Sequence, residues 1–158
     1  MENVTIKRTH GRDPDFSALL KLLDEELWNE LMEDQATYEP HNQVDDVATA
    51  LVLYVADQPI ASGCLRAFSS DTAEIKRMFV RKPYRGRGLS RLVLSELETW
   101  AMEEGYSFAL LETSVRFSVA IRLYESSGYR VIPNYGPYLG LSESVCMKKD
   151  LQPAALLR

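Results

Sequence analysis

The chain has 158 residues, of which 46% are hydrophobic and 26% charged, a composition typical of one globular domain with its own core. Its formal net charge of −5 argues against a general nucleic-acid-binding protein, which would present a broad basic surface. No apolar run approaches the roughly 18 residues that span a bilayer. The first ten residues do not have the charged and then apolar pattern of a secretory signal, so we expect a cytoplasmic protein.

The amino-terminal third is predicted to contain one strand and one long helix. Residues 4–10 alternate in polarity, as a half-buried strand does. Asp13 followed by Pro14 is typical of a helix start, and the apolar residues of 14–32 recur with a helical period. Residues 33–47 are polar and interrupted by a proline, so we expect an irregular loop or short helix of the kind that often lines a site.

Three successive strands are predicted for the middle of the chain. Residues 48–56, 60–68 and 72–80 are largely apolar or alternating. The stretches DQP and SSD between them are turn-forming and favour antiparallel hairpins.

Two helices and three further strands are predicted for the remainder. Apolar residues with helical spacing occupy 88–104 and 118–128, and a glycine ends each helix. The apolar run 108–114 between them suits a buried parallel strand. Residues 129–135 and 142–151 predict two antiparallel strands that close the sheet.

Domain organisation and cysteine usage are both simple. We find no linker or repeat, and therefore predict a single α/β (α+β) domain over residues 1–151 with a tail of 152–158. Cys64 and Cys146 lie in strand-like runs without metal-ligand spacing, so we expect buried, reduced thiols.

The stretch VRKPYRGRGLSR, residues 80–91, combines five basic residues with two glycines directly before a predicted helix. Residues 75–95 carry seven basic groups and no acidic one, which leaves a net charge of −12 on the rest of the chain. A helix amino terminus has unpaired N–H groups and a partial positive charge, and glycine lets an anion approach closely. These features predict a small polyanionic ligand, with a solvated basic loop as the alternative.

Two familiar phosphate-binding loops do not match this stretch. The dinucleotide fingerprint requires a third glycine where this chain has Arg91, and the GK[ST] motif of NTPase loops is absent from the sequence.

The surrounding residues 73–101, AEIKRMFVRKPYRGRGLSRLVLSELETWA, resemble the acetyl-CoA-binding core of the GNAT superfamily of N-acetyltransferases. The family pattern is Arg or Gln, two residues, Gly, one residue, and Gly or Ala; this chain places Ser90, which is also small, at the last position. Residues 120–151 are similar to the last helix and strands of small bacterial members. The resemblance is good over 45–151 and loose before it, and Phe117-Ser118 replaces an expected Gln-Pro pair at the last helix.

This resemblance implies the GNAT fold, a mixed, largely antiparallel sheet with helices on both faces and a V-shaped split between parallel strands 72–80 and 108–114. The pantetheine of acetyl-CoA would pair with the backbone of Met78, Phe79 and Val80. Its pyrophosphate would lie on consecutive backbone N–H groups, those of Arg85, Gly86, Arg87, Gly88, Leu89 and Ser90. The candidates for the outer phosphate are Arg81, Lys82 and Arg91.

The resemblance also implies acetyl transfer to a primary amine by direct attack on the thioester. Tyr124 is the candidate acid, because a tyrosine at this helix position is directed at the thioester sulfur in the family. Its alternative role is that of a core residue. The backbone N–H of Phe79 is the candidate oxyanion donor.

Glu74 is the leading candidate for the base that deprotonates the amine, because some GNAT enzymes have a glutamate base on this strand. Glu112 and a water chain are the alternatives. Glu74 could instead form an ion pair with Lys76 or Arg77.

The acceptor amine is not indicated by the sequence, and its carrier could be a small molecule or a peptide. A polar rim attractive to a cation could form from acidic and aromatic residues, namely Glu33, Asp34, Tyr38, Glu39, Asp45, Asp46, Tyr135 and Tyr138. A solvated loop is the alternative interpretation.

Other partners and functions are constrained by the same residues. His10 and His41 do not have metal-ligand spacing, so we expect no metal. GNAT folds often pair, so a homodimer is possible. The alternative function is a non-catalytic acyl-CoA-binding module on the same fold. A nucleic-acid-binding module is disfavoured by the acidic remainder of the chain.

Overall fold

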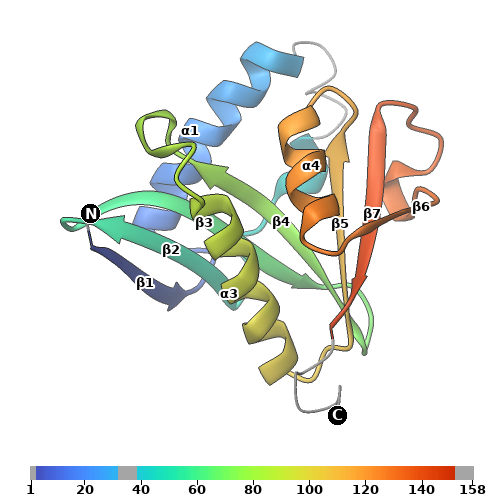
Figure 1. The fold of residues 1–158 in the computed structure, drawn as a ribbon, viewed down its shortest axis with the longest axis horizontal. Coiled ribbons are helices and arrows are strands. Elements are labelled where there is room, and N and C mark those ends of the chain that lie inside the picture. Colours follow the sequence, from blue (N-terminus) through green and yellow to red (C-terminus); the bar gives the residue numbers. More distant parts are fainter. Residues whose placement is uncertain (1–2, 32–38, 152–158) are drawn as a thin grey trace. The chain divides into compact units, whose positions relative to one another are not determined.

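The computed structural model describes residues 3–31 and 39–151 (Figure 1). The predicted tail 152–158 and residues 33–38 of the predicted loop lie outside the described residues. Seven strands form one mixed sheet in the order β1-β2-β3-β4-β5-β7-β6. The strands are β1 (Val4–Thr9), β2 (Thr49–Val55), β3 (Gln58–Ala67), β4 (Thr72–Val80), β5 (Phe108–Ser114), β6 (Arg130–Ile132) and β7 (Ser144–Asp150).

Three α-helices and three short 3₁₀-helices connect these strands in the described residues. They are α1 (Pro14–Leu31), α3 (Leu89–Glu103), α4 (Ser118–Ser126), η2 (Glu39–Asn42), η3 (Lys82–Tyr84) and η4 (Gly136–Tyr138). None of these helices is long and apolar enough to cross a membrane. The predicted helices are confirmed to within about two residues at each end, as expected for strongly periodic segments.

The predicted strand over 129–135 is too long, because β6 ends at Ile132. Pro133 has no N–H to donate to a sheet ladder. The side-chain amide of Asn134 donates instead to the carbonyl oxygens of Tyr138, at 3.2 Å, and Leu141, at 2.9 Å. These bonds hold the segment that contains η4 as a compact turn rather than a strand.

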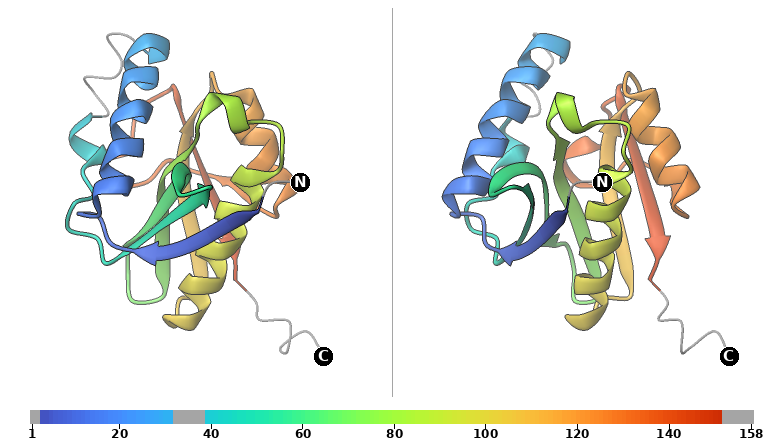
Figure 2. Two further views of the ribbon diagram at one scale, coloured as in Figure 1. Left: turned by 90° about the vertical axis from the view of Figure 1, so that its left-hand side faces the viewer. Right: turned by 60° about the vertical axis from the view of Figure 1, so that its left-hand side comes forward.

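The described residues divide into two compact units, each made of discontinuous segments. Unit 1 comprises the described residues up to Arg66 together with Lys76–Leu97. In it, Phe16 and Leu19 of α1 pack with Val52 and Cys64 on one face of the strands. A Cβ atom on Gly63 would lie 2.9 Å from the side chains of Val93 and Leu97, so α3 approaches the other face closely (Figure 2).

Unit 2 comprises Ala67–Ile75 and the described residues from Glu98 onward. Its first strand segment pairs in parallel with β5 over three residue pairs, Thr72–Phe108, Ala73–Ala109 and Glu74–Leu110. In the described part of the chain, no further pair is formed between these strands, although β5 continues along β7 as far as Ser114. The predicted parallel pairing of β4 and β5 is confirmed. A ladder of only three residue pairs agrees with the predicted split between these two strands.

Both cysteines are free and buried, which confirms the prediction of reduced thiols. Cys64 belongs to the apolar core of unit 1. Cys146 lies opposite Glu112 in the β5–β7 ladder, in much more polar surroundings.

Candidate active site

The second half of β4 carries the three residues predicted to pair with pantetheine. Phe79 and Val80 are buried and Met78 is partly buried. Just before them, Arg77 adopts a left-handed φ of 60° inside the strand. A left-handed residue within a strand is typical of a local bulge, where regular pairing is interrupted.

The glycine loop follows η3 and leads into α3. Gly86 and Gly88 have φ values of 77° and 78°, and no atom lies within 4 Å of the position that a Cβ would take on either residue. Backbone conformation therefore requires glycine here, and the space in front of the loop is open. The N–H of Leu92 donates to the carbonyl of Gly88 at 3.1 Å. The N–H groups that precede it in the first turn are the ones an anion could use.

Arg85 has a structural role that the sequence analysis did not identify. Its Nε donates to the carbonyl oxygen of Val80 at 2.8 Å, and its Nη2 lies 2.7 Å from the carboxylate of Glu26 in α1. Its own N–H donates to the carbonyl of Lys82 at 3.2 Å. The backbone of residues 86–90 therefore fits a diphosphate better than the N–H of Arg85, which already has an acceptor.

Tyr124 is buried in α4, with 7% of its surface exposed, and its ring meets Tyr129 edge-on at 5.9 Å. Burial, reinforced by the negative charge of Glu112, raises the pKa of Tyr124 to about 12. The phenol is thus protonated at neutral pH and available as a donor. Phe117 provides no side-chain cap for this helix, in line with the expected departure at its start.

Glu74 is buried and accepts a hydrogen bond of 2.7 Å from the hydroxyl of Tyr135. Burial, and then the adjacent Glu74 carboxylate, raise the pKa of Tyr135 well above its usual value. The alternative ion pair between Arg77 and Glu74 is not found among the described residues. The guanidinium of Arg77 instead binds the carboxylate of Asp24 at 2.6 Å.

Glu112, the alternative base, accepts a hydrogen bond of 2.8 Å from the hydroxyl of Ser144. The ladder registers place it on the same sheet face as Glu74, since Leu110 lies opposite Glu74 and two residues before Glu112. Burial raises the pKa of Cys146, which faces the same polar cluster; the backbone N–H of Tyr135 opposes this effect. Unit 2 therefore concentrates buried and partly buried polar groups on one face of β5 and β7.

Tyr135 also organises an aromatic group above this cluster. Its ring meets those of Phe68, at 5.2 Å, and Tyr138, at 5.6 Å, both edge-on. From the sequence alone, Tyr135 is only a candidate rim residue. Its bond to Glu74 joins positions 61 residues apart, a distance over which no sequence pattern predicts contact.

The other predicted rim residues lie either outside the described residues or in the other unit. Glu33, Asp34 and Tyr38 lie outside the described residues, as does the side chain of Glu39. Asp45 and Asp46 belong to unit 1. No group of three metal-binding side chains occurs in residues 3–31 and 39–151, as far as their side chains are described.

Comparison with known proteins identifies the family. The profile of the acetyltransferase (GNAT) family matches residues 14–129, well over half of the chain. The chain belongs to the GNAT family. Among curated GNAT relatives, an IAA acetyltransferase of Azospirillum brasilense is 38% identical over 78 residues, which make up 49% of this chain and 51% of that protein. The chain spans about half the length of the curated relatives it matches.

Solved structures confirm the GNAT fold. A protein of Klebsiella pneumoniae assigned as an acyl-CoA N-acyltransferase is 25% identical, with a TM-score of 0.80 over 94% of this chain and 98% of that one. A GNAT acetyltransferase of Elizabethkingia anophelis, solved with acetyl-CoA bound, is 15% identical, with a TM-score of 0.68 over 96% and 100% of the two chains. The second likeness concerns the fold alone.

Proposed function

We propose that this GNAT protein is an acetyl-CoA-dependent N-acetyltransferase that acetylates a primary amine of a small molecule or peptide by direct attack. The observation that carries the proposal is the open loop at the start of α3, where Gly86 and Gly88 hold left-handed conformations in front of unobstructed space. This geometry suits a diphosphate bound by backbone N–H groups. The bound acetyl-CoA of the Elizabethkingia relative supports the same ligand.

Residues on both sides of this loop would hold the rest of the ligand. The backbone of Met78, Phe79 and Val80 would pair with the pantetheine arm, in the manner of an added strand. Bound acetyl-CoA supplies an activated carbonyl and a thiolate leaving group. The N–H of Phe79 is the proposed donor to the carbonyl oxygen.

Tyr124 is proposed as the donor to the sulfur of the leaving group. Because its pKa is raised to about 12, the phenol keeps its proton at neutral pH. It can therefore donate a hydrogen bond to the negative charge that develops on the leaving sulfur. Glu74 is proposed to receive the proton of the amine, directly or through water. Tyr135 would fix the orientation of this carboxylate through its 2.7 Å hydrogen bond. Glu112 is the second candidate for the same role.

Binding and turnover can be tested separately. Acetyl-CoA at 100 times its Kd should raise the free energy of unfolding by about 2.7 kcal/mol, measured as a thermal shift. Thiol release from acetyl-CoA is then measured across a panel of primary amines. Absence of any shift contradicts the proposal, and a shift without turnover of any amine identifies a non-catalytic acyl-CoA-binding module.

A further inference from the structure

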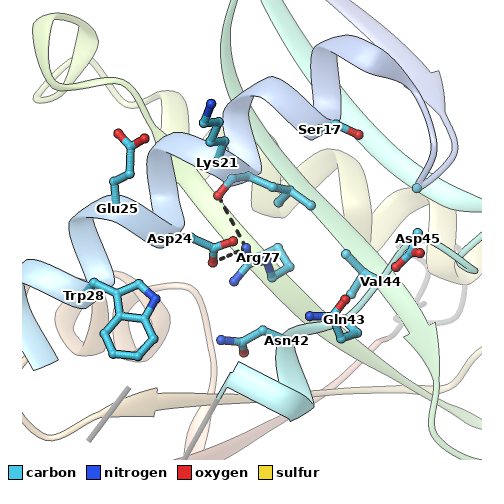
Figure 3. A pocket seen from close by; sticks show the side chains of 12 residues that line it. Ser17, Lys21, Asp24, Glu25, Trp28, Asn42, Gln43, Val44, Asp45 and Arg77 are labelled. Atoms are coloured by element: carbon cyan, nitrogen blue, oxygen red, sulfur yellow. Dashed lines mark hydrogen bonds and ion pairs between the residues drawn. The ribbon is translucent and has the colours of Figure 1, made fainter. Parts of the chain in front are cut away.

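A groove in unit 1 carries charged and aromatic groups that the proposed chemistry does not use. It has a volume of about 570 Å³ and lies along one face of α1. Figure 3 shows Arg77 between α1 and the segment that contains Asn42 and Gln43. We call it the α1 groove, and the lining residues that matter here are Lys21, Asp24, Glu25, Trp28, Asp45 and Arg77.

Arg77 is the unusual member of this lining. Its side chain is only 4% exposed, and its Nη2 binds the Asp24 carboxylate at 2.6 Å and the Leu20 carbonyl at 3.5 Å (Figure 3). Its Nε is buried without a hydrogen-bond partner in the described structure. Buried donors without acceptors are rare in folded proteins, because losing the bond to water has a substantial free-energy cost. An acceptor oxygen supplied by a ligand would satisfy this donor.

Asp24 presents the opposite charge next to this donor. Its side chain is 45% exposed even though one of its oxygens binds Arg77. The groove thus offers a cation and an accessible anion in direct contact. A ligand that carries both charged groups on one carbon atom would complement the pair, its carboxylate directed at Arg77 and its ammonium at Asp24.

Ligands with a single charge fit the α1 groove less well. A simple carboxylate would be attracted by Lys21 but repelled by Glu25 and Asp45, and all three residues line the groove. A simple amine would leave the Nε of Arg77 without an acceptor. Trp28, whose surface is 43% exposed, offers an apolar surface and a π face for the rest of the ligand.

We propose that the α1 groove binds an α-amino acid with an apolar side chain. This binding does not depend on the proposed transferase activity. The head group would engage Arg77 and Asp24, and the apolar side chain would pack on Trp28.

Direct binding to the full chain tests the proposal without any turnover. The probes are L-phenylalanine, L-leucine and L-methionine, each compared with the matching amine that lacks the carboxylate and the matching acid that lacks the ammonium. We expect at least one amino acid to bind about tenfold or more tightly than both of its analogues, as loss of a charged hydrogen bond predicts. Equal or absent binding across all three sets overturns the proposal.

Variants then locate the site. Asp24→Asn should remove the advantage of the amino acid over the acid that lacks an ammonium, and Arg77→Gln should remove its advantage over the matching amine. Asp57→Asn is the matched control, since Asp57 is exposed in the β2–β3 turn and does not line the groove. If Arg77→Gln does not fold, the Asp24→Asn variant still tests the proposal, because Asp24 is half-exposed and its substitution should be tolerated. Equal losses in Asp24→Asn and Asp57→Asn overturn the proposal.

The outcome also separates this inference from the proposed function. Absence of amino-acid binding, together with acetylation of any amine, contradicts the groove assignment and leaves the transferase standing. Amino-acid binding that is sensitive to Asp24→Asn, without turnover of any amine, supports the groove assignment and contradicts the transferase.

Discussion

The phenol of Tyr124 combines deep burial with a proton that it keeps beyond neutral pH. Removing only this hydroxyl, in Tyr124→Phe, should lower kcat on the order of 100-fold, since the leaving sulfur loses its donor. The affinity for acetyl-CoA should change little. Steady-state kinetics and the cofactor thermal shift measure the two effects.

A matched substitution shows whether that loss is specific. Tyr106→Phe removes a hydroxyl from another tyrosine of unit 2 and should leave kcat unchanged. Full activity in Tyr124→Phe would remove Tyr124 from the mechanism and assign it to the core, packed against Tyr129.

The hydrogen bond between Tyr135 and Glu74 should be energetically important, because it is short and its acceptor is buried. Tyr135→Phe removes the hydroxyl that donates this bond, and Glu74→Gln removes the negative charge of the acceptor. A double-mutant cycle measured by urea unfolding should give a coupling energy of about 1.5–3 kcal/mol, the range for a hydrogen bond to a charged group. Additive effects of the two substitutions would show that the tyrosine does not hold the carboxylate.

At the level of elements, alanine substitutions of glycines at the two ends of α3 can distinguish effects on folding from effects on acetyl-CoA binding. Gly86, Gly88 and Gly105 all have positive φ and open space at the Cβ position. Alanine at any of the three should therefore destabilise the fold by a similar amount, about 1–2 kcal/mol. Only Gly86→Ala and Gly88→Ala should also weaken acetyl-CoA binding, because Gly105 follows the far end of α3. Isothermal titration checks this, and an equal loss of affinity in Gly105→Ala would argue against the loop.

The start of α1 depends on Asp13, whose Oδ1 accepts a 2.8 Å hydrogen bond from the N–H of Asp15. Burial alone would raise the pKa of Asp13, but the bonds from Lys7, Thr9 and the Asp15 N–H outweigh it and lower the pKa from 3.8 to about 2. Because the pKa of Asp13 is lower in the folded than in the unfolded state, its ionised carboxylate stabilises the fold fully at pH values above the unfolded-state pKa. This stabilisation is lost as the pH falls from about 4 towards 2.

This pKa difference contributes about 2 kcal/mol to the free energy of unfolding at neutral pH. Asp13→Asn retains a capping oxygen but not the charge, so it should destabilise the protein at pH 6 and have little effect near pH 2. Urea unfolding of both proteins across this range tests the sign. A difference that stays constant with pH would contradict it.

Patterns within single elements are sufficient to predict the helices and the glycine loop, whereas the parallel strand pair follows from the resemblance to the GNAT family. Helical periodicity, the Asp13-Pro14 start and the Gly86-x-Gly88 spacing are all local features of the sequence. The contacts that were missed join distant positions. The bonds from Tyr135 to Glu74 and from Arg77 to Asp24 span 61 and 53 residues, and only the folded chain brings these groups together.

At the level of the whole molecule, the seven basic groups in residues 75–95 do not form one uniform cationic surface. Lys76 and Arg77 are buried, and Arg77 and Arg85 are paired with carboxylates of α1. Of the seven, Arg81 is partly exposed, and the exposed ones are Lys82, Arg85, Arg87 and Arg91. The field available to an anion is therefore concentrated at the glycine loop of a chain whose net charge is −5.

This distribution predicts a salt dependence confined to the phosphate end of the ligand. The Debye length falls from about 10 Å at 0.1 M to about 3 Å at 1 M, so sodium chloride should weaken acetyl-CoA binding several-fold between these concentrations. Acetyl-pantetheine carries the same thioester arm without phosphates, and its Kd should stay nearly constant over the same range. Isothermal titration of both ligands makes the comparison within one protein. Equal salt effects on the two would mean that the basic loop does not bind the phosphates, and the assignment of residues 86–90 would fail with it.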